Sequence, residues 1–375
     1  MLADPSAAQP LSLTRTAAHQ ASSAGNLPAL DGLRAAAVAL VFLSHYVPAL
    51  LPGVPGIERL FPGMFGVTLF FVISGFLIST LLRREFLAAG TIGLKNFYVR
   101  RLLRLTPALY VYVAVVAAAY IVVDGAIVAR DFLAALTYTA NYYEAWHPSE
   151  RNLYFMPVWS LAVEEHFYLL FPALMLLCMR RSMKALTAAV LVGIVASLAW
   201  RLVLARDAAV SWEAIYWRTD TRLDSLLFGV LLTCLSSARP DALSARSGAV
   251  LGVALLACSV VIRDEYFRNT LRYSLQGCAL MLIVGHLVKG TSGIASAVRR
   301  ASRTAPVLYL SKISYSLYLW HLTVLMFARH LLGAMTPATA LLCAAASLGL
   351  AAASYRCVET PFLAMRHRFG SHADR

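Results

Sequence analysis

The feature that most constrains this chain is a succession of ten apolar segments, each close to the length of a membrane-crossing helix. A helix needs about 20 residues to cross a hydrocarbon core of about 30 Å. The hydrophobic share of the 375 residues is 59% and the charged share only 14%, a composition typical of bilayer proteins. We therefore predict an all-α fold, a polytopic transmembrane helix bundle of about ten spans. The predicted spans cover residues 33–51, 64–82, 106–123, 157–178, 185–204, 222–236, 248–262, 271–288, 306–331 and 338–357.

Long polar stretches stand at the two ends of the chain. We predict a disordered cytoplasmic tail over residues 1–26, a transmembrane domain over 27–364 and a second cytoplasmic tail over 365–375. The first tail lacks the residue succession of a signal peptide, so we expect it in the mature protein. The apolar segment 131–146 is too short to span and is predicted to be interfacial or re-entrant.

Basic residues gather in short loops beside the apolar segments, and this pattern predicts the orientation of the bundle. With the N-terminus in the cytoplasm, roughly two-thirds of the Lys and Arg residues lie on the cytoplasmic side. Both termini are then cytoplasmic. The same pattern accounts for the net charge of +14, so no nucleic-acid partner is expected.

Ionisable side chains inside spans are costly, and each is a candidate functional residue. Arg34 and His45 are eleven residues apart, so on a helix they share a face and lie about 16 Å apart along its axis. His45 would then lie deep in the membrane, where a neutral imidazole can act as a general base. The alternative is a histidine that hydrogen-bonds a neighbouring helix.

A second basic motif precedes the third apolar segment. Arg101 and Arg104 are three residues apart, so their guanidinium groups share a helix face and can bind phosphates together. The alternative is an anchor to lipid phosphate at the cytoplasmic surface. Between these motifs, Gly66, Ser74 and Gly75 favour close packing of helices.

Two adjacent carboxylates, Glu164 and Glu165, precede His166 inside the fourth segment. Glu165 would lie about 12 Å deep, near the depth of His45, so one glutamate could support that imidazole. A pairing with Arg34 or Arg222 is the rival interpretation. No second pair of ligands follows at the spacing of a metal site, and no metal is predicted.

Two further groups of polar residues lie toward the C-terminus. Asp224 and its neighbours Asp220 and Arg222 are expected to form ion pairs at the outer mouth, either as structure or to hold a hydroxylated acceptor. Tyr318 and His321 continue a polar stripe that Ser314 begins on the ninth segment, and they are candidates for substrate binding.

Six strings in this order resemble the membrane-bound acyltransferase family three, whose members O-acylate bacterial surface polysaccharides, peptidoglycan, nodulation factors and some macrolides. The resemblance runs from about Leu30 to Pro361. The strings are LDGLRA with a following His, GVTLFFVISGFLI, FYVRRLLRL-x-P, WSLAVEEHFYLLFP, TRLDSLLFG and SYSLYLWH.

The resemblance implies roles for individual residues. Arg34 and His45 match the essential Arg and His of the family, and Arg101 and Arg104 match a cytoplasmic pair thought to engage acyl-CoA. The acidic motif contains both glutamates, with His166 where the family usually has Gln. The soluble esterase-like domain of some members is not expected, so the membrane domain or a separate protein would meet the acceptor.

The hypothesis is transfer of a short acyl group from acetyl-CoA, or another short acyl-CoA, to a hydroxyl of a carbohydrate acceptor. It implies a multi-pass protein of the cytoplasmic (inner) membrane, with the lipid bilayer, acyl-CoA and a carbohydrate or polyketide as partners. The alternatives are O-acylation of a macrolide-type molecule, a transporter or flippase of a polar solute, and a purely structural subunit. The two cytoplasmic arginines favour a phosphate-bearing donor over an uncharged solute.

Overall fold

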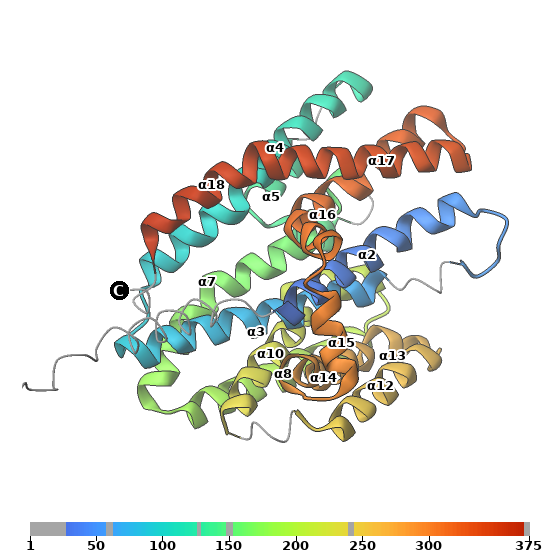
Figure 1. Cartoon of the computed structure of the whole chain (residues 1–375). Helices are drawn as coiled ribbons and strands as arrows, with labels where there is room; N and C mark the ends of the chain where they lie inside the picture. Colours follow the sequence, from blue (N-terminus) through green and yellow to red (C-terminus); the bar gives the residue numbers. More distant parts are fainter. Residues whose placement is uncertain (1–27, 58–62, 126–128, 148–152, 239–243, 371–375) are drawn as a thin grey trace, which may run out of the picture.

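The computed structural model describes residues 28–57, 63–125, 129–147, 153–238 and 244–370, and this part of the chain is helical with no strand. The predicted N-terminal tail lies outside the described residues. Ten long helices, each overlapping one predicted segment, form the bundle (Figure 1). They are α2 (Pro28–Leu50), α3 (Gly63–Ala89), α4 (Leu94–Asp124), α7 (Val158–Arg181), α8 (Met183–Leu204), α10 (Thr219–Ala238), α12 (Arg246–Val261), α14 (Leu271–Lys289), α16 (Ala305–Leu332) and α17 (Pro337–Ser354).

Eight helical stretches in the described part of the chain are long and apolar enough to cross a membrane. The prediction of a polytopic all-α bundle is therefore confirmed, although the count differs from ten. The helix α12 is apolar but has only 16 residues, and α16 has 28 residues but carries the polar stripe that ends at His321. A 28-residue helix is about 42 Å long, which exceeds the hydrocarbon thickness.

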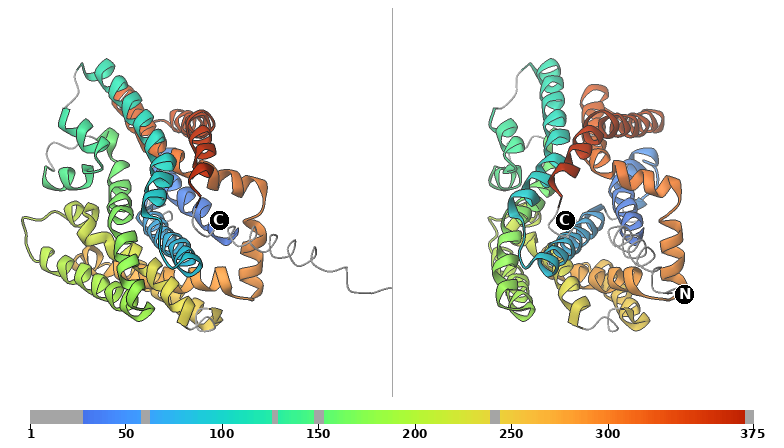
Figure 2. Two further views of the ribbon diagram at one scale, coloured as in Figure 1. Left: turned by 90° about the vertical axis from the view of Figure 1, so that its left-hand side faces the viewer. Right: turned by 60° about the vertical axis from the view of Figure 1, so that its left-hand side comes forward.

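Short helices fill the connections. The segment 131–146 forms α5 (Ala129–Leu136) and α6 (Ala140–Trp146), both too short to span. They lie at one edge of the molecule (Figure 2), where α5 packs against α4 and α6 against α7 and α9. The remaining short helices are α9 (Trp212–Trp217), α13 (Glu265–Asn269), α15 (Gly293–Ala301) and α18 (Thr360–Met365), with single turns η3 (Leu153–Phe155), η4 (Tyr355–Glu359) and η5 (Arg366–Phe369).

Part of the predicted C-terminal tail is helical and packed. Its turn η5 lies against the start of α4, where Arg100 Nη1 donates to the backbone oxygen of Phe369 at 2.7 Å. Asn96 Nδ2 donates to the oxygen of Gly370 at 3.3 Å. These contacts order residues that composition alone had indicated to be disordered or interfacial.

The centre of the bundle is the packing of α3 against α10, with α2 on another side of α3. A Cβ atom on Gly75 would lie 1.9 Å from the backbone oxygen of Leu226, and one on Gly229 would lie 2.1 Å from that of Val72. Glycine therefore lets the two backbones approach more closely than any other residue would allow. The predicted role of Gly75 in packing agrees with this contact.

A buried ion pair joins α8 to α10. Arg201 Nη2 lies 2.6 Å from Asp224 Oδ2, and both side chains are 0% exposed. Ser274 on α14 donates to the same carboxylate oxygen at 2.6 Å, and Arg201 also donates to the backbone oxygen of Thr221. The pair thus links three helices at a point that lipid and water do not reach.

Candidate functional site

Two cavities lie in series between the helices that carry the predicted site residues. The larger has a volume of about 630 Å³ and is lined by the end of α2, the starts of α3, α7 and α14, and the middle of α16. The smaller has a volume of about 80 Å³ and is lined by residues closer to the start of α2 and further along α3 and α7. We call them the outer and inner cavities, because the predicted orientation turns the first away from the cytoplasm.

His45 lines the outer cavity. Its Nδ1 lies 2.8 Å from the backbone oxygen of Val41, one helical turn earlier. Because a carbonyl can only accept, Nδ1 carries the proton, and Nε2 holds a free lone pair. Ser44 Oγ lies 3.3 Å from the same Nδ1. The structure shows no hydrogen-bond partner of Nε2 among the described residues.

The second ring beside His45 belongs to His321 on α16, with ring centroids 5.2 Å apart. His321 is 2% exposed, its Nδ1 lies 2.7 Å from the backbone oxygen of Tyr318, and its Nε2 has no partner among the described residues. Tyr46 Oη donates to the backbone oxygen of His321 at 2.8 Å and so holds α2 against α16. Two imidazoles thus present acceptor nitrogens in one region.

The inner cavity is lined by three guanidinium groups, those of Arg34, Arg101 and Arg104, and one carboxylate, that of Glu164. Arg101 stacks over the ring of Tyr168 at 4.7 Å. The lining thus carries more positive than negative groups, although Glu165 also interacts with Arg101 and Asp31 with Arg34. The structure therefore brings together the three arginines predicted to bind the donor.

The two glutamates do not lie beside His45, contrary to the expectation from their depth. Glu164 Oε1 accepts a hydrogen bond from Ser74 at 2.5 Å and faces the inner cavity. Glu165 lines neither cavity, and its Oε1 has no partner among the described residues. Depth along a helix says nothing about its rotation, and the carboxylate of Glu164 points to the guanidinium side. The carbonyl of Val41 orients the imidazole instead.

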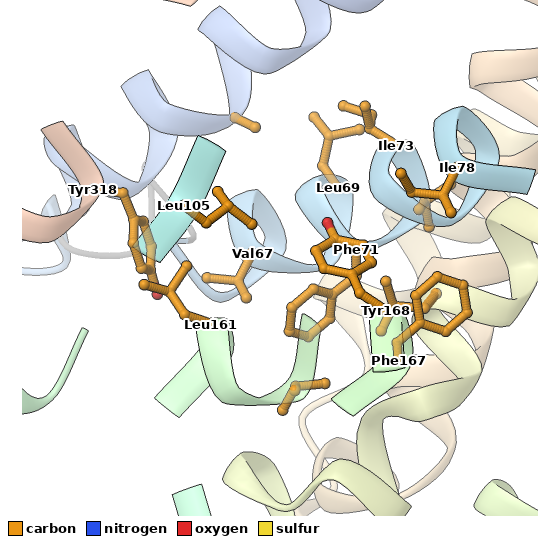
Figure 3. Close-up of a cluster of buried hydrophobic side chains, with 14 of the residues drawn as sticks. Val67, Leu69, Phe71, Ile73, Ile78, Leu105, Leu161, Phe167, Tyr168 and Tyr318 are labelled. Atoms are coloured by element: carbon orange, nitrogen blue, oxygen red, sulfur yellow. The ribbon is translucent and has the colours of Figure 1, made fainter. Parts of the chain in front are cut away.

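The two cavities meet at Val67 and Tyr318, the residues that line both. Figure 3 shows these two side chains at one end of a buried hydrophobic cluster, with Leu105 and Leu161, which also line the inner cavity. Ser160 Oγ donates to the Tyr318 hydroxyl at 2.7 Å, so the phenol proton remains available to another acceptor. Val67 and Tyr318 are thus the lining residues common to the cavity with the imidazoles and the cavity with the arginines.

Other predicted residues lie elsewhere. Asp224 lines neither cavity, and its carboxylate accepts hydrogen bonds from Arg201 and Ser274. Of the two roles considered for this residue, the structure therefore supports the structural one and not a contact with substrate. The expected pairing of Asp224 with Arg222 is also wrong. Arg222 donates to Thr68 at 2.9 Å and packs against aromatic rings.

His166 points away from both cavities. Its Nδ1 lies 2.7 Å from Thr219 Oγ1 at the start of α10, and its ring faces that of Tyr142. Within the described residues no group of three or more His, Cys, Asp or Glu side chains is arranged to hold a metal ion.

The sequence interpretation missed the outer lining. Arg263, Arg268 and Arg272 line the outer cavity, together with Trp159, Trp212, Tyr216 and Trp217. A signal was present, because two of the arginines fall in a connection predicted to lie outside and Arg272 begins the span that follows it, against the general bias of basic residues to the cytoplasmic side.

The fold and the two cavities define a polytopic α-helical membrane protein with two adjoining internal cavities, one lined by two histidines and the other by three arginines. The chain belongs to the acyltransferase family: the family described as "Acyltransferase domain" matches residues 27–356. The resemblance drawn from the six sequence strings is thus confirmed.

Individual relatives agree with this membership. The chain is 31% identical over 363 residues to a protein named "Putative O-acetyltransferase" from Staphylococcus aureus (strain COL), covering 90% of this chain and 57% of that protein. It is 30% identical over 360 residues to "O-acetyltransferase OatA" from Staphylococcus aureus (strain NCTC 8325 / PS 47), covering 89% of this chain and 57% of that protein. The chain therefore spans little more than half the length of these relatives. No solved structure matches.

Proposed function

We propose that the protein transfers a short acyl group from acyl-CoA, with acetyl-CoA as the first candidate, to a hydroxyl of a carbohydrate acceptor. The observation that carries the proposal is the cavity pair: His45 lines one cavity, three arginines line the other, and the two meet at Val67 and Tyr318. Membership of the acyltransferase family and the names of its relatives support acyl transfer as the chemistry.

The donor would enter from the cytoplasmic side. An inner cavity of about 80 Å³ has room for several water molecules but not for a nucleotide, so the nucleotide of acyl-CoA would stay at the mouth. Arg101 and Arg104 would bind its phosphates, since guanidinium groups suit phosphate oxygens bidentately, and Arg34 lines the same cavity. The narrow pantetheine arm would then carry the thioester toward Tyr318.

The reaction would begin when Nε2 of His45 takes the proton of the acceptor hydroxyl. The alkoxide attacks the thioester carbonyl, and the Tyr318 phenol, whose own proton is free, donates a hydrogen bond to the oxygen that gains charge. Collapse of the tetrahedral intermediate forms the ester and expels the coenzyme thiolate, which takes the proton from the His45 imidazolium. His321 Nε2 is an acceptor and would hold a neighbouring hydroxyl of the acceptor.

The test is acyl transfer by purified protein carrying His45→Gln. We expect transfer to fall by about 10²- to 10⁴-fold, the usual contribution of a general base, while acetyl-CoA binding is retained. His166→Gln is the matched control, because that ring contacts Thr219 and lines neither cavity. Arg101→Gln should instead raise the KM for acyl-CoA. Undiminished turnover by His45→Gln would remove this residue from the mechanism.

A further inference from the structure

The arginines of the outer cavity have no assigned role in the transfer. Arg263 and Arg268 are exposed and belong to the connection between α12 and α14, whereas Arg272 is half-buried and lies in the first turn of α14. The structure gives none of them a carboxylate partner within the described residues. Arg272 contacts only the ring and hydroxyl of Tyr273, at 5.3 Å and 3.5 Å.

The charge of the outer cavity is unbalanced. Among the described residues of the lining, Glu213 is the only carboxylate, against three guanidinium groups. The acidic residues of the same connection, Asp264 and Glu265, are not part of the lining, and Asp264 accepts from the backbone nitrogen of Phe267 at 2.7 Å as the cap of α13. A ligand in this cavity therefore meets a positive potential.

Membrane topology does not explain these arginines. In the predicted orientation they lie on the outer side, where basic residues are depleted. Nor does an uncharged acceptor explain them, because a neutral glycan or a polyketide offers no negative group that could pair with the guanidinium groups.

The rest of the lining is compatible with a sugar. Trp212 is 46% exposed and presents an aromatic ring, Trp159 and Trp217 are buried behind the surface, and Gln276 donates to Ser259 at 3.3 Å. Aromatic faces pack against the C–H faces of sugar rings, and a volume of about 630 Å³ lies within the range of ligand sites. Arginine supplies bidentate recognition of a carboxylate.

We propose that the acceptor is an acidic carbohydrate, one whose carboxylates are bound by Arg263, Arg268 and Arg272 while a ring hydroxyl reaches His45. This rests on the proposed function and adds the chemical class of the acceptor. The outer arginines thereby select the acceptor, as the inner arginines would select the donor.

The experiment compares two probes that differ in one group: oligogalacturonides and galacto-oligosaccharides of equal length. Binding to purified full-length protein is measured in nanodiscs of phosphatidylcholine, with acetyl-CoA binding measured separately. We expect the acidic probe to bind at least about tenfold more tightly. Replacement of all three arginines by Gln should abolish the difference, and replacement by Lys should keep part of it.

The control variant is Arg206→Gln, an exposed arginine predicted on the same outer side but absent from the lining. Equal binding of both probes, or binding of neither, overturns the proposal. A second arm adds phosphatidylglycerol: if the triple variant loses affinity for that lipid and none for the acidic probe, the arginines bind lipid phosphate and the proposal is wrong. If the wild-type protein does not bind acetyl-CoA, that result counts against the proposed function instead.

Discussion

Replacing Asp224 by Asn separates the structural role assigned to this residue from a role in binding substrate. The carboxylate lies 2.6 Å from Arg201 Nη2, both side chains are fully buried, and Ser274 completes the coordination of the same oxygen. The variant keeps the shape but leaves a buried guanidinium without its counter-ion, which costs about 3–5 kcal/mol. We expect the free energy of unfolding to fall by this amount.

The assay is unfolding of the detergent-solubilised protein by SDS titration, within a double-mutant cycle. Arg201→Met and Asp224→Leu should each destabilise strongly, whereas the double variant should lose less than the sum, because no buried charge remains. Asp224→Asn protein that remains folded should have the same KM for the acceptor as the wild-type protein. Additive losses in the cycle, or a raised acceptor KM at unchanged stability, would refute the structural role.

Two further predictions concern Val67, which lines both cavities, and the contact between α3 and α10. Val67→Phe should narrow the passage between the two cavities and lower the rate of acyl transfer at least about tenfold, with acetyl-CoA binding intact. Val67→Ala should remain active. Acyl-transfer assays and equilibrium binding of acetyl-CoA test this prediction. Gly75→Ala should reduce the yield of folded protein in size-exclusion chromatography, because its Cβ would meet the Leu226 oxygen at 1.9 Å. Gly349→Ala, where nothing lies within 4 Å, should not, and equal yields would contradict the close approach of α3 and α10.

The pattern of apolar segments was sufficient to predict the helices. Each long helix overlaps a predicted span, because crossing the bilayer fixes both the length and the composition of a segment. The basic motif of Arg101 and Arg104 could be predicted to share a face for an equally local reason, the 3.6-residue period of the helix. The sequence spacing of two residues on one helix is enough to give their relative positions.

The lateral partners could not be predicted in this way. Depth placed Glu165 near His45 and left either glutamate to support the imidazole, but the structure pairs Glu164 with Ser74 and gives His45 the ring of His321 as its neighbour. Likewise Asp224 pairs with Arg201 on another helix and not with Arg222 two residues away.

The sequence by itself determined that the chain is a bundle of apolar helices and which ionisable groups those helices carry into it. The tertiary structure decided which of those groups meet, and it alone gathered three arginines at the outer cavity and three at the inner one. The physical reason is that span formation depends on local hydrophobicity. Contacts between spans depend on the rotation of each helix and on which helix lies beside it, and both are set by packing over the whole bundle.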